Sequence, residues 1–331
     1  ETEYWTFMFT IWWAQYEGYD NFKNYFTGHY YDDNGEKQVA LNAENLKQKG
    51  REESFKLLAK FMQKKNGYSH TYCDSMSFAQ AQAALFGRGF GQIDSKLCAF
   101  MVNGDWADAE MKESAGKYNQ SVKFMRSPVI SALGEKLGIT EEQLQNIVSY
   151  VDSVLDGNPI SVPSFSSSKG LTTEQVISSV KEARCMVYDL GRHHNIVLPK
   201  NPRRSNEVTE LAKEFLRFFA SDFASKIYVE ALEGLNLPYG YKIEDTTRFS
   251  TFVKSMHDSL KEPIPVSYYK TTALTFAGNI YITPAYKLET YIFPSTMDSD
   301  ALGTKMYNDT ITRYTVDRDW QEILRISGLI D

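Results

Sequence analysis

The sequence has few cysteines and no long apolar run. Its 331 residues include three cysteines, Cys73, Cys98 and Cys185, an odd number without CxxC spacing. Neither a disulfide framework nor a thiolate zinc site is therefore expected. The longest mainly apolar run covers residues 7–14, far fewer than the roughly 20 residues that a helix needs to cross a bilayer. A chain of this length buries enough surface to fold around its own core, usually as two lobes or domains.

The sequence also has no excess of basic residues. Lysine and arginine together number 36 against 42 aspartates and glutamates, which gives a formal net charge of −6. Nucleic-acid binding requires a clustered basic face that neutralises phosphates. The basic groups here, such as Arg203-Arg204, are short and isolated. A DNA or RNA partner is therefore not expected.

Motifs that specify cofactor or metal chemistry are missing as well. No GxxxxGK[ST], HExxH or GxSxG pattern occurs, and residues 87–91 do not have the GxGxxG spacing. His193 and His194 are adjacent, so in an extended chain they point to opposite faces and do not bind one ion together. Neither a cofactor nor a metal is expected.

Aromatic residues, in contrast, are abundant. They make up 14% of the chain, with 21 Tyr, 20 Phe and 5 Trp. Flat rings with polar rims suit ligands such as sugars, whose faces are weakly apolar and whose edges carry hydroxyl groups. An aromatic-rich core is the alternative, and composition alone does not separate the two.

The periodicity of apolar residues predicts a helix-rich α/β protein. Short buried strands are predicted at residues 97–102, 122–125 and 196–199, and Asp32–Gly35 is a strong turn signal. Ser77 and Ser205 are predicted helix caps, although Asn206 is an alternative to Ser205. The predicted helices cover residues 5–17, 42–65 (with a break at Gly50), 78–85, a stretch from 107, 139–154, 172–189, 206–219 and a C-terminal stretch around Trp320.

Carboxylates around Trp106 open a catalytic alternative. Glycoside hydrolases use two acids beside aromatic platforms, and Asp105 directly follows the predicted strand 97–102. Asp108 and Glu110 lie one turn further on, where acidic side chains stabilise the positive end of the next helix. Asp105 is therefore the carboxylate that a glycan-degrading hydrolase would use, together with a distant second acid.

Three stretches, in this order, carry a resemblance to a known family. The first is the strand 97–102 that leads into Asn103-Gly104-Asp105-Trp106. The second is the segment 194–199 followed by the helix with Ala212-Lys213-Glu214-Phe215-Leu216. The third is residues 219–222 followed by Leu237-Pro238-Tyr239. Together they resemble the extracellular solute-binding proteins of bacterial carbohydrate ABC importers, the group that includes maltose-binding protein, over most of the chain.

The resemblance implies a two-lobed, periplasmic-binding-protein-like (type II) architecture that closes on a sugar without catalysis. The implied partners are a carbohydrate ligand and the permease subunits of the importer in the membrane, and a monomer is expected. Trp106 matches the family's cleft tryptophan, and Tyr4 and Trp5 match an aromatic position where a long helix meets the cleft. Asn103, Asp105, Trp12 and Tyr239 are further predicted ligand contacts, although core packing is the alternative for Trp12 or its neighbour Trp13.

A physical argument supports Trp106 independently of the resemblance. In open α/β sheets, ligands bind at the carboxyl ends of the strands. Trp106 lies on the turn after the predicted strand 97–102, so its indole is expected to project from the sheet edge as a rigid stacking face. The alternative is an indole that fills the interior of its lobe.

The resemblance also predicts how the chain is divided. Residues 1–134 correspond to a second-lobe core, 135–190 to an inserted helical hairpin, 191–245 to the returning segment of the first lobe, and 246–331 to C-terminal helices. The first lobe is expected to be incomplete in this chain, so unpartnered apolar faces and aggregation are expected. An extracellular location, lipid-anchored or periplasmic, is implied for the full-length parent protein.

Overall fold

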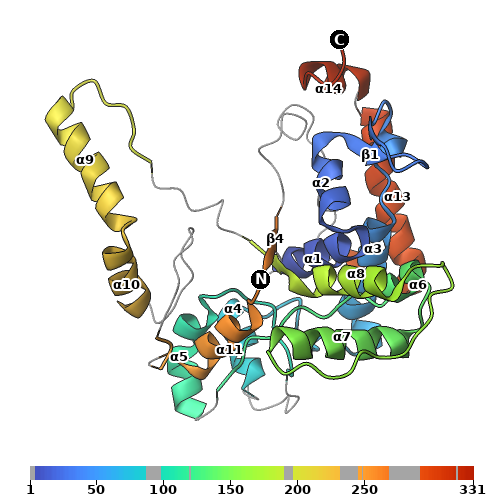
Figure 1. The fold of residues 1–331 in the computed structure, drawn as a ribbon, viewed down its shortest axis with the longest axis horizontal. Coiled ribbons are helices and arrows are strands. Elements are labelled where there is room, and N and C mark those ends of the chain that lie inside the picture. Colours follow the sequence, from blue (N-terminus) through green and yellow to red (C-terminus); the bar gives the residue numbers. More distant parts are fainter. Residues whose placement is uncertain are drawn as a thin grey trace. The chain divides into compact units, whose positions relative to one another are not determined.

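The structure, a computed structural model, describes residues 4–86, 98–118, 121–189, 197–231, 245–247, 249–267, 291–317 and 320–331. These residues are rich in helices and contain few strands, which confirms the helix-rich character predicted for the chain (Figure 1). They form two compact units. Unit 1 comprises residues 1–102, 126–188 and 261–331, and unit 2 comprises residues 103–125 and 189–260.

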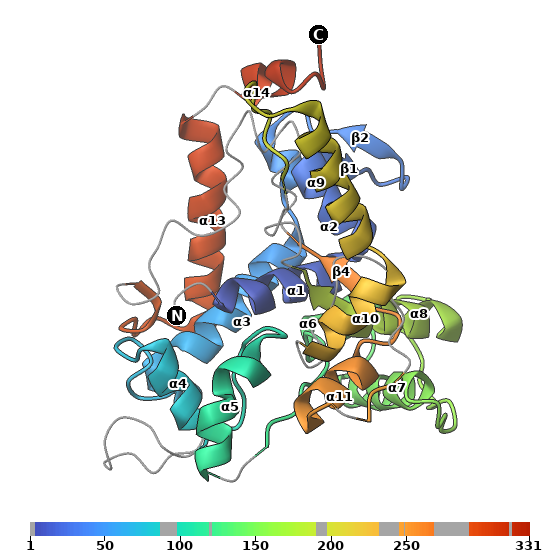
Figure 2. The same ribbon diagram turned by 90° about the vertical axis from the view of Figure 1, so that its left-hand side faces the viewer.

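The first core of unit 1 lies among four helices, α1 (Trp5–Glu17), α2 (Tyr19–Thr27), α3 (Lys49–Met62) and α13 (Ser299–Asp317). Helix α3 packs against both α1 and α13 (Figure 1 and Figure 2). The predicted first helix is confirmed, together with its end at Glu17, since Gly18 at φ +85° stops α1. The largest side chains of this core are buried rings: Phe9, Trp13, Phe22, Tyr25, Phe26 and Phe55.

Two glycines allow the helices of this core to approach closely. A Cβ atom on Gly50 of α3 would lie 2.8 Å from Tyr16 Cβ and 2.9 Å from the Trp13 carbonyl oxygen of α1. A Cβ atom on Gly303 of α13 would lie 2.4 Å from the Cα and N atoms of Lys56.

The predicted helix 42–65 is instead α3 flanked by two 3₁₀ turns, η1 (Ala43–Leu46) and η2 (Lys64–Asn66). Gly50 does not interrupt α3 but provides the contact with α1.

The second core of unit 1 lies among α6 (Ala132–Leu137), α7 (Glu141–Leu155) and α8 (Thr173–Cys185). Helices α7 and α8 pack side by side and each begins with a capping box, formed by Thr140 with Gln143 and by Thr172 with Gln175. In both boxes the threonine hydroxyl accepts the backbone N–H of the glutamine, and the glutamine side-chain oxygen accepts the backbone N–H of the threonine. The helices predicted at 139–154 and 172–189 are confirmed, except that the second ends at Cys185.

The described strands are short and were not predicted. β1 (His29–Tyr31) and β2 (Lys37–Val39) form an antiparallel hairpin in which His29 faces Val39. The Asp32–Gly35 turn between them is confirmed, since Asp32 Oδ1 accepts the N–H groups of Asn34 and Glu36 at 2.9 Å. β3 (Met186–Tyr188) pairs in parallel with β4 (Ile264–Val266).

Two further helices of unit 1, among the residues that the structure describes, confirm predictions. Helix α4 (Phe78–Leu85) begins with the predicted cap, since Ser77 and Gln80 form a capping box. Phe78 stands in the first turn of this helix and is 50% exposed. Helix α14 (Trp320–Ile326) buries Trp320, whose Nε1 donates to the Ala40 carbonyl at 2.8 Å.

Unit 2 contains α5 (Ala107–Tyr118), α9 (Asn206–Phe219), α10 (Asp222–Ala231) and α11 (Thr251–Ser259). The predicted capping residue of α9 is confirmed as Ser205, whose Oγ accepts the Val208 N–H at 3.3 Å. Helix α9 carries an apolar stripe, but none of its side chains is buried.

The three predicted strands are wrong in the residues that the structure describes. Residues 98–102, 122–125 and 197–199 have no strand conformation. Phe100 is 76% exposed and Val197 is 74% exposed, so these residues are not covered as a buried strand would be. An apolar run forms a strand only beside a pairing strand, and the described strands lie in other parts of the chain.

Candidate functional site

The predicted site residues of unit 2 lie in one turn that leads into α5. Asn103 Oδ1 accepts the Gly104 N–H at 2.8 Å, and the Gly104 carbonyl accepts the Ala107 N–H at 3.0 Å. The Trp106 carbonyl then accepts the Glu110 N–H at 3.1 Å within α5. The structure therefore brings Asn103, Asp105 and Trp106 together at the start of a helix. They do not lie at the end of a strand, so the sheet-edge argument for Trp106 is wrong.

The indole of Trp106 lies directly against the backbone of Gly104. A Cβ atom on Gly104 would lie 2.2 Å from the indole Cζ3 and 2.3 Å from Cη2. The glycine therefore provides the space that the ring occupies, and any larger residue there would displace it. Trp106 is only partly buried, as are Asn103 and Asp105. This turn combines a positioned aromatic ring with two partly exposed polar side chains, which is the combination that sugar recognition uses.

The two other carboxylates of this region have structural roles. Asp108 and Glu110 lie in the first turn of α5, as predicted, where their charge is favourable near the positive helix end. Asp108 Oδ2 also accepts the hydroxyl of Ser250 at 2.6 Å. Since Ser250 caps α11, this bond connects the beginnings of α5 and α11.

The predicted aromatic residues of α1 belong to unit 1 and have different surroundings. Tyr4 stacks on Phe7 at a ring distance of 5.1 Å, and Phe7 stacks on Tyr188 at 4.6 Å. Trp5 meets Phe9 edge-on at 5.9 Å and packs partly buried against the first core. The sequence did not predict a role for Phe7 or Tyr188. The i, i+3 spacing of Tyr4 and Phe7 indicates that the two rings share one face of the helix. Tyr188 contacts Phe7 only through tertiary packing, which the sequence does not indicate.

Trp12 is placed in the interior. Trp12 is 8% exposed and packs in the second core, and its ring stacks on that of Phe61 with 5.9 Å between the ring centroids. Its neighbour Trp13 is fully buried and donates from Nε1 to Gln48 Oε1 at 2.6 Å. Core packing therefore accounts for both residues, and a ligand contact by Trp12 has no exposed ring to support it. Tyr239 lies outside the described residues.

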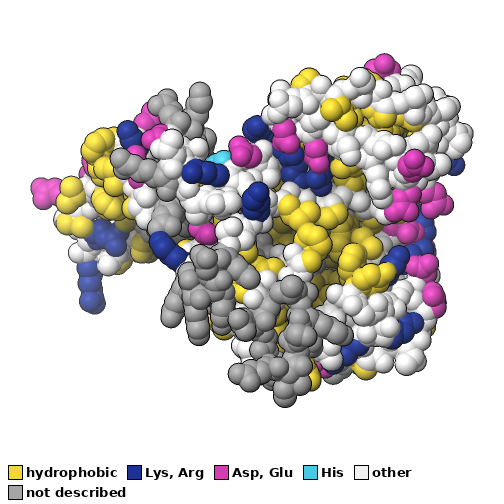
Figure 3. Space-filling model, turned by 90° about the horizontal axis from the view of Figure 1, so that it is seen from below, with side chains coloured by type: hydrophobic (Ala, Val, Ile, Leu, Met, Phe, Trp, Pro, Cys, Tyr) yellow, Lys and Arg dark blue, Asp and Glu magenta, His cyan; other side chains and the backbone are white. Residues whose placement is uncertain are grey.

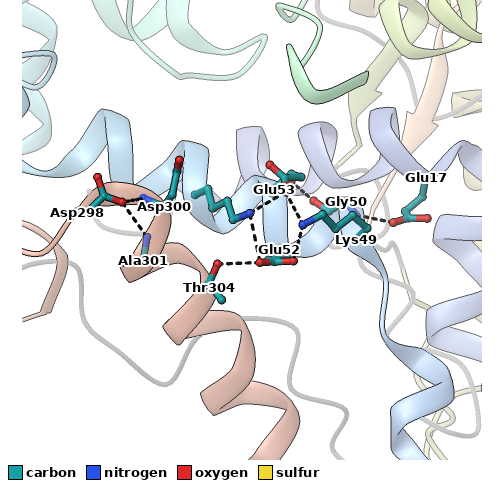
Figure 4. Close-up of polar contacts among 11 residues, drawn as sticks. Glu17, Lys49, Gly50, Glu52, Glu53, Asp298, Asp300, Ala301 and Thr304 are labelled. Atoms are coloured by element: carbon teal, nitrogen blue, oxygen red, sulfur yellow. Dashed lines mark hydrogen bonds and ion pairs between the residues drawn. The ribbon is translucent and has the colours of Figure 1, made fainter. Parts of the chain in front are cut away.

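A network of charges on α3 was not predicted. Lys49 Nζ contacts both Glu52 and Glu53 at 2.8 Å. Thr304 of α13 donates to Glu52 at 2.7 Å, as Figure 4 shows. Burial raises the pKa of Glu52, but hydrogen bonds from Lys49, Thr304 and Lys56 outweigh it and lower that pKa to about 2. Because it connects α3 to α13, the network has a structural role.

A second charged cluster surrounds the break between α1 and α2. Glu17 accepts the Gly50 N–H and the Asn21 side-chain amide, both at 2.6 Å (Figure 4 shows the Gly50 bond). Lys136 of α6 donates to the carbonyls of Tyr16 and Glu17 at the end of α1. Burial raises the pKa of Glu17, and the charge of Lys136 only partly opposes this. Burial likewise lowers the pKa of Lys136. The cluster supplies hydrogen-bond partners for the N–H of Gly50 in the first turn of α3 and for the carbonyls at the end of α1, where backbone groups have no partner within their own helix.

Glu17→Gln is expected to stabilise the protein at neutral pH. Because the pKa of Glu17 is raised in the folded state, its contribution to stability is largest below the unfolded value and is lost as the pH rises through the folded value. Glutamine removes the buried charge and retains an acceptor for Gly50, and the Asn21 amide can turn so that its oxygen accepts the new NH2 group, so the free energy of unfolding should rise at pH 7 and hardly change at pH 4. Urea unfolding at both pH values tests this, with exposed Glu135→Gln as the control. A loss of stability at pH 7 would contradict it.

Across the described ranges, no group of three or more His, Cys, Asp or Glu side chains is arranged to hold a metal ion. None of the helices that the structure describes combines the length and the apolar character needed to span a bilayer. Comparison with known proteins found no matching family model, no matching curated protein and no matching solved structure.

Proposed function

We propose that this protein binds a carbohydrate without transforming it and delivers it to the permease of an ABC importer. The observation that carries the proposal is the turn at residues 103–106. There the indole of Trp106 lies against Gly104, beside the partly exposed side chains of Asn103 and Asp105. Stacking on the indole would supply much of the affinity, and the two polar side chains would select the hydroxyl groups.

The aromatic residues Tyr4 and Trp5 support the proposal from unit 1. Both are only partly buried, and each is positioned by a ring contact with Phe7 or Phe9. The proposal implies a two-lobed architecture of the type II class that closes on its ligand, and a location outside the cytoplasmic membrane. Closure is the signal that a permease would recognise, since it distinguishes the loaded from the empty protein.

Trp106→Ala is expected to weaken carbohydrate binding about 30-fold or more, because a central aromatic contact typically contributes about 2 kcal/mol or more. A panel of oligosaccharides is first titrated while tryptophan fluorescence is followed. Affinities are then measured by isothermal titration calorimetry, which does not depend on the removed indole. Trp12→Phe is the matched control, because its ring is buried in the second core and its replacement should leave the affinity unchanged.

The same incubations test the catalytic alternative. Products are analysed by mass spectrometry after prolonged incubation with each oligosaccharide. Saturable binding without cleavage supports the proposal. Cleavage that Asp105→Asn abolishes would overturn it in favour of a hydrolase. The absence of both binding and cleavage across the panel would overturn both functions and favour a domain that acts only through partner binding.

A further inference from the structure

One short hydrogen bond connects the first turn of α5 to the beginning of α11. Ser250 Oγ donates to Asp108 Oδ2 at 2.6 Å, and the two residues lie 142 positions apart in the sequence. This length is typical of a hydroxyl group that donates to a carboxylate, a bond about twice as strong as one between neutral groups. The same hydroxyl oxygen accepts the Val253 N–H at 3.2 Å and so caps α11. Both bonds together fix the orientation of the hydroxyl group.

The helix that carries this serine is held in place by buried side chains. Phe252, Val253 and Met256 of α11 are 6%, 4% and 0% exposed. Helix α9 of the same unit differs, because none of its side chains is buried. Figure 3 shows hydrophobic side chains at the surface on the left, where Figure 1 places α9 and α10. Among the helices described in unit 2, α11 is therefore a well-packed support for a neighbouring turn.

A second contact joins α11 to the segment that follows α5. Ser255 Oγ accepts the Phe124 N–H at 2.7 Å. The ring of Phe124 also meets that of Phe252 edge-on, with 6.0 Å between the ring centroids. Helix α11 therefore contacts the chain both at the start of α5 and beyond its end, so α5 and the turn before it are held from two sides.

Asp108 stands two residues after the indole of the proposed site. Trp106 and Asp108 belong to one helical turn, because the Trp106 carbonyl accepts the Glu110 N–H at 3.1 Å. The first turn of a helix frays easily, since its N–H groups have no partner within the helix. A bond from another helix to a side chain in this turn opposes fraying. It also fixes the backbone from which the indole of Trp106 extends.

We propose that the bond between Asp108 and Ser250 positions Trp106 for carbohydrate recognition. This inference rests on the proposed function of the turn at residues 103–106. Gly104 provides the space against which the indole lies, and the bond to α11 holds the helical end of the same turn. Asp108 and Ser250 do not contact the carbohydrate and act only through Trp106. A ring that is already in place raises the affinity, because binding then does not have to order it.

Fluorine NMR tests the position of the indole without any carbohydrate. The chain contains five tryptophans, which are labelled as 5-fluorotryptophan, and the resonance that Trp106→Phe removes is that of Trp106. Ser250→Ala and Asp108→Ala should each shift or broaden this resonance and leave those of the other tryptophans in place. Ser250→Thr and Asp108→Asn should restore it, because threonine keeps the hydroxyl group and asparagine keeps an acceptor oxygen.

Isothermal titration calorimetry then measures the affinity of the same variants for a panel of malto-, cello-, xylo- and manno-oligosaccharides. Ser250→Ala should weaken binding about fivefold or more, because part of the preorganisation of the site is lost. Asp108→Ala should cause a similar loss and add nothing in the double variant, since both residues act through one bond. Ser250→Thr should retain the affinity. All titrations are made below the onset of thermal unfolding of each variant, so that a loss of stability alone does not change the result.

Ser205→Ala is the matched control. Ser205 caps α9 by accepting the Val208 N–H at 3.3 Å, so this variant also loses the cap of a helix in unit 2. Because α9 does not carry the turn at residues 103–106, both the affinity and the Trp106 resonance should stay unchanged.

Three results would overturn this inference while the proposed function stands. The first is an unchanged affinity in Ser250→Ala, whether or not its stability falls or its Trp106 resonance moves. The second is an unchanged resonance in that variant. The third is an equal loss of affinity in Ser205→Ala, which would indicate a general effect of losing a helix cap. If the unsubstituted protein binds no oligosaccharide of the panel, the proposed function is overturned and this inference with it.

Discussion

Gly303→Ala is expected to lower the free energy of unfolding by about 2–3 kcal/mol. The added methyl group would lie 2.4 Å from Lys56 Cα and N, and backbone atoms cannot rotate away as the end of a side chain can. Helices α13 and α3 must therefore separate. Overpacking of this kind typically costs 1–3 kcal/mol, and here it also disturbs Leu302 and Met306, which are buried in the same core. Urea unfolding followed by near-ultraviolet circular dichroism measures the loss.

Gly134→Ala is the matched control for this substitution. Gly134 is also a buried helical glycine, but the nearest atoms to its added Cβ, in Ile139 and Leu144, lie at 3.4 Å. Alanine is the better helix former by about 1 kcal/mol, so this variant should unfold within about 0.5 kcal/mol of the unsubstituted protein or be more stable. Equal losses at both positions would contradict the prediction, because the close contact with backbone atoms is present at Gly303 and not at Gly134.

The helices were predictable from the sequence because their signals are local. Ser77, Ser205 and the turn at Asp32–Gly35 act within a few residues, and the structure shows each of them in the expected role. Strands depend on partners that are distant in sequence. Met186–Tyr188 pairs with a segment almost eighty positions away, whereas the apolar run that includes Phe100 has no strand beside it in the described residues. Apolar character alone therefore misplaced the sheets.

The candidate site was predictable only in part, for a related reason. Asn103, Asp105 and Trp106 are close in sequence, so their proximity follows from the chain itself. The way in which Gly104 supports the indole is a matter of backbone geometry, which residue types do not encode. Trp12 shows the opposite limit, because its position on an aromatic helix face was equally compatible with a cleft and with a core. The stacking on Phe61, which decides between them, comes from α3.

The charged residues that join α7 and α8 give the second large expected effect. Arg184 forms two bonds with Asp152, from Nε at 2.9 Å and from Nη2 at 2.8 Å. Arg126 contacts the same carboxylate at 3.2 Å. The arginine side chains are only 12% and 9% exposed, so this carboxylate neutralises two poorly solvated charges. A bidentate pair of this kind is among the stronger polar contacts of a protein.

Asp152→Ala should therefore lower the free energy of unfolding by about 3 kcal/mol, since removing one partner leaves the other charge desolvated. Asp156→Ala removes a carboxylate that also contacts Arg126, at 2.8 Å, but its side chain is 50% exposed, so its loss should cost less than about 1 kcal/mol. Asp152→Asn should fall between them, because the amide retains one acceptor for Arg184. If thermal unfolding ranks Asp156→Ala at or above Asp152→Ala, the stability of the α7–α8 pair must come from its apolar core and not from this network.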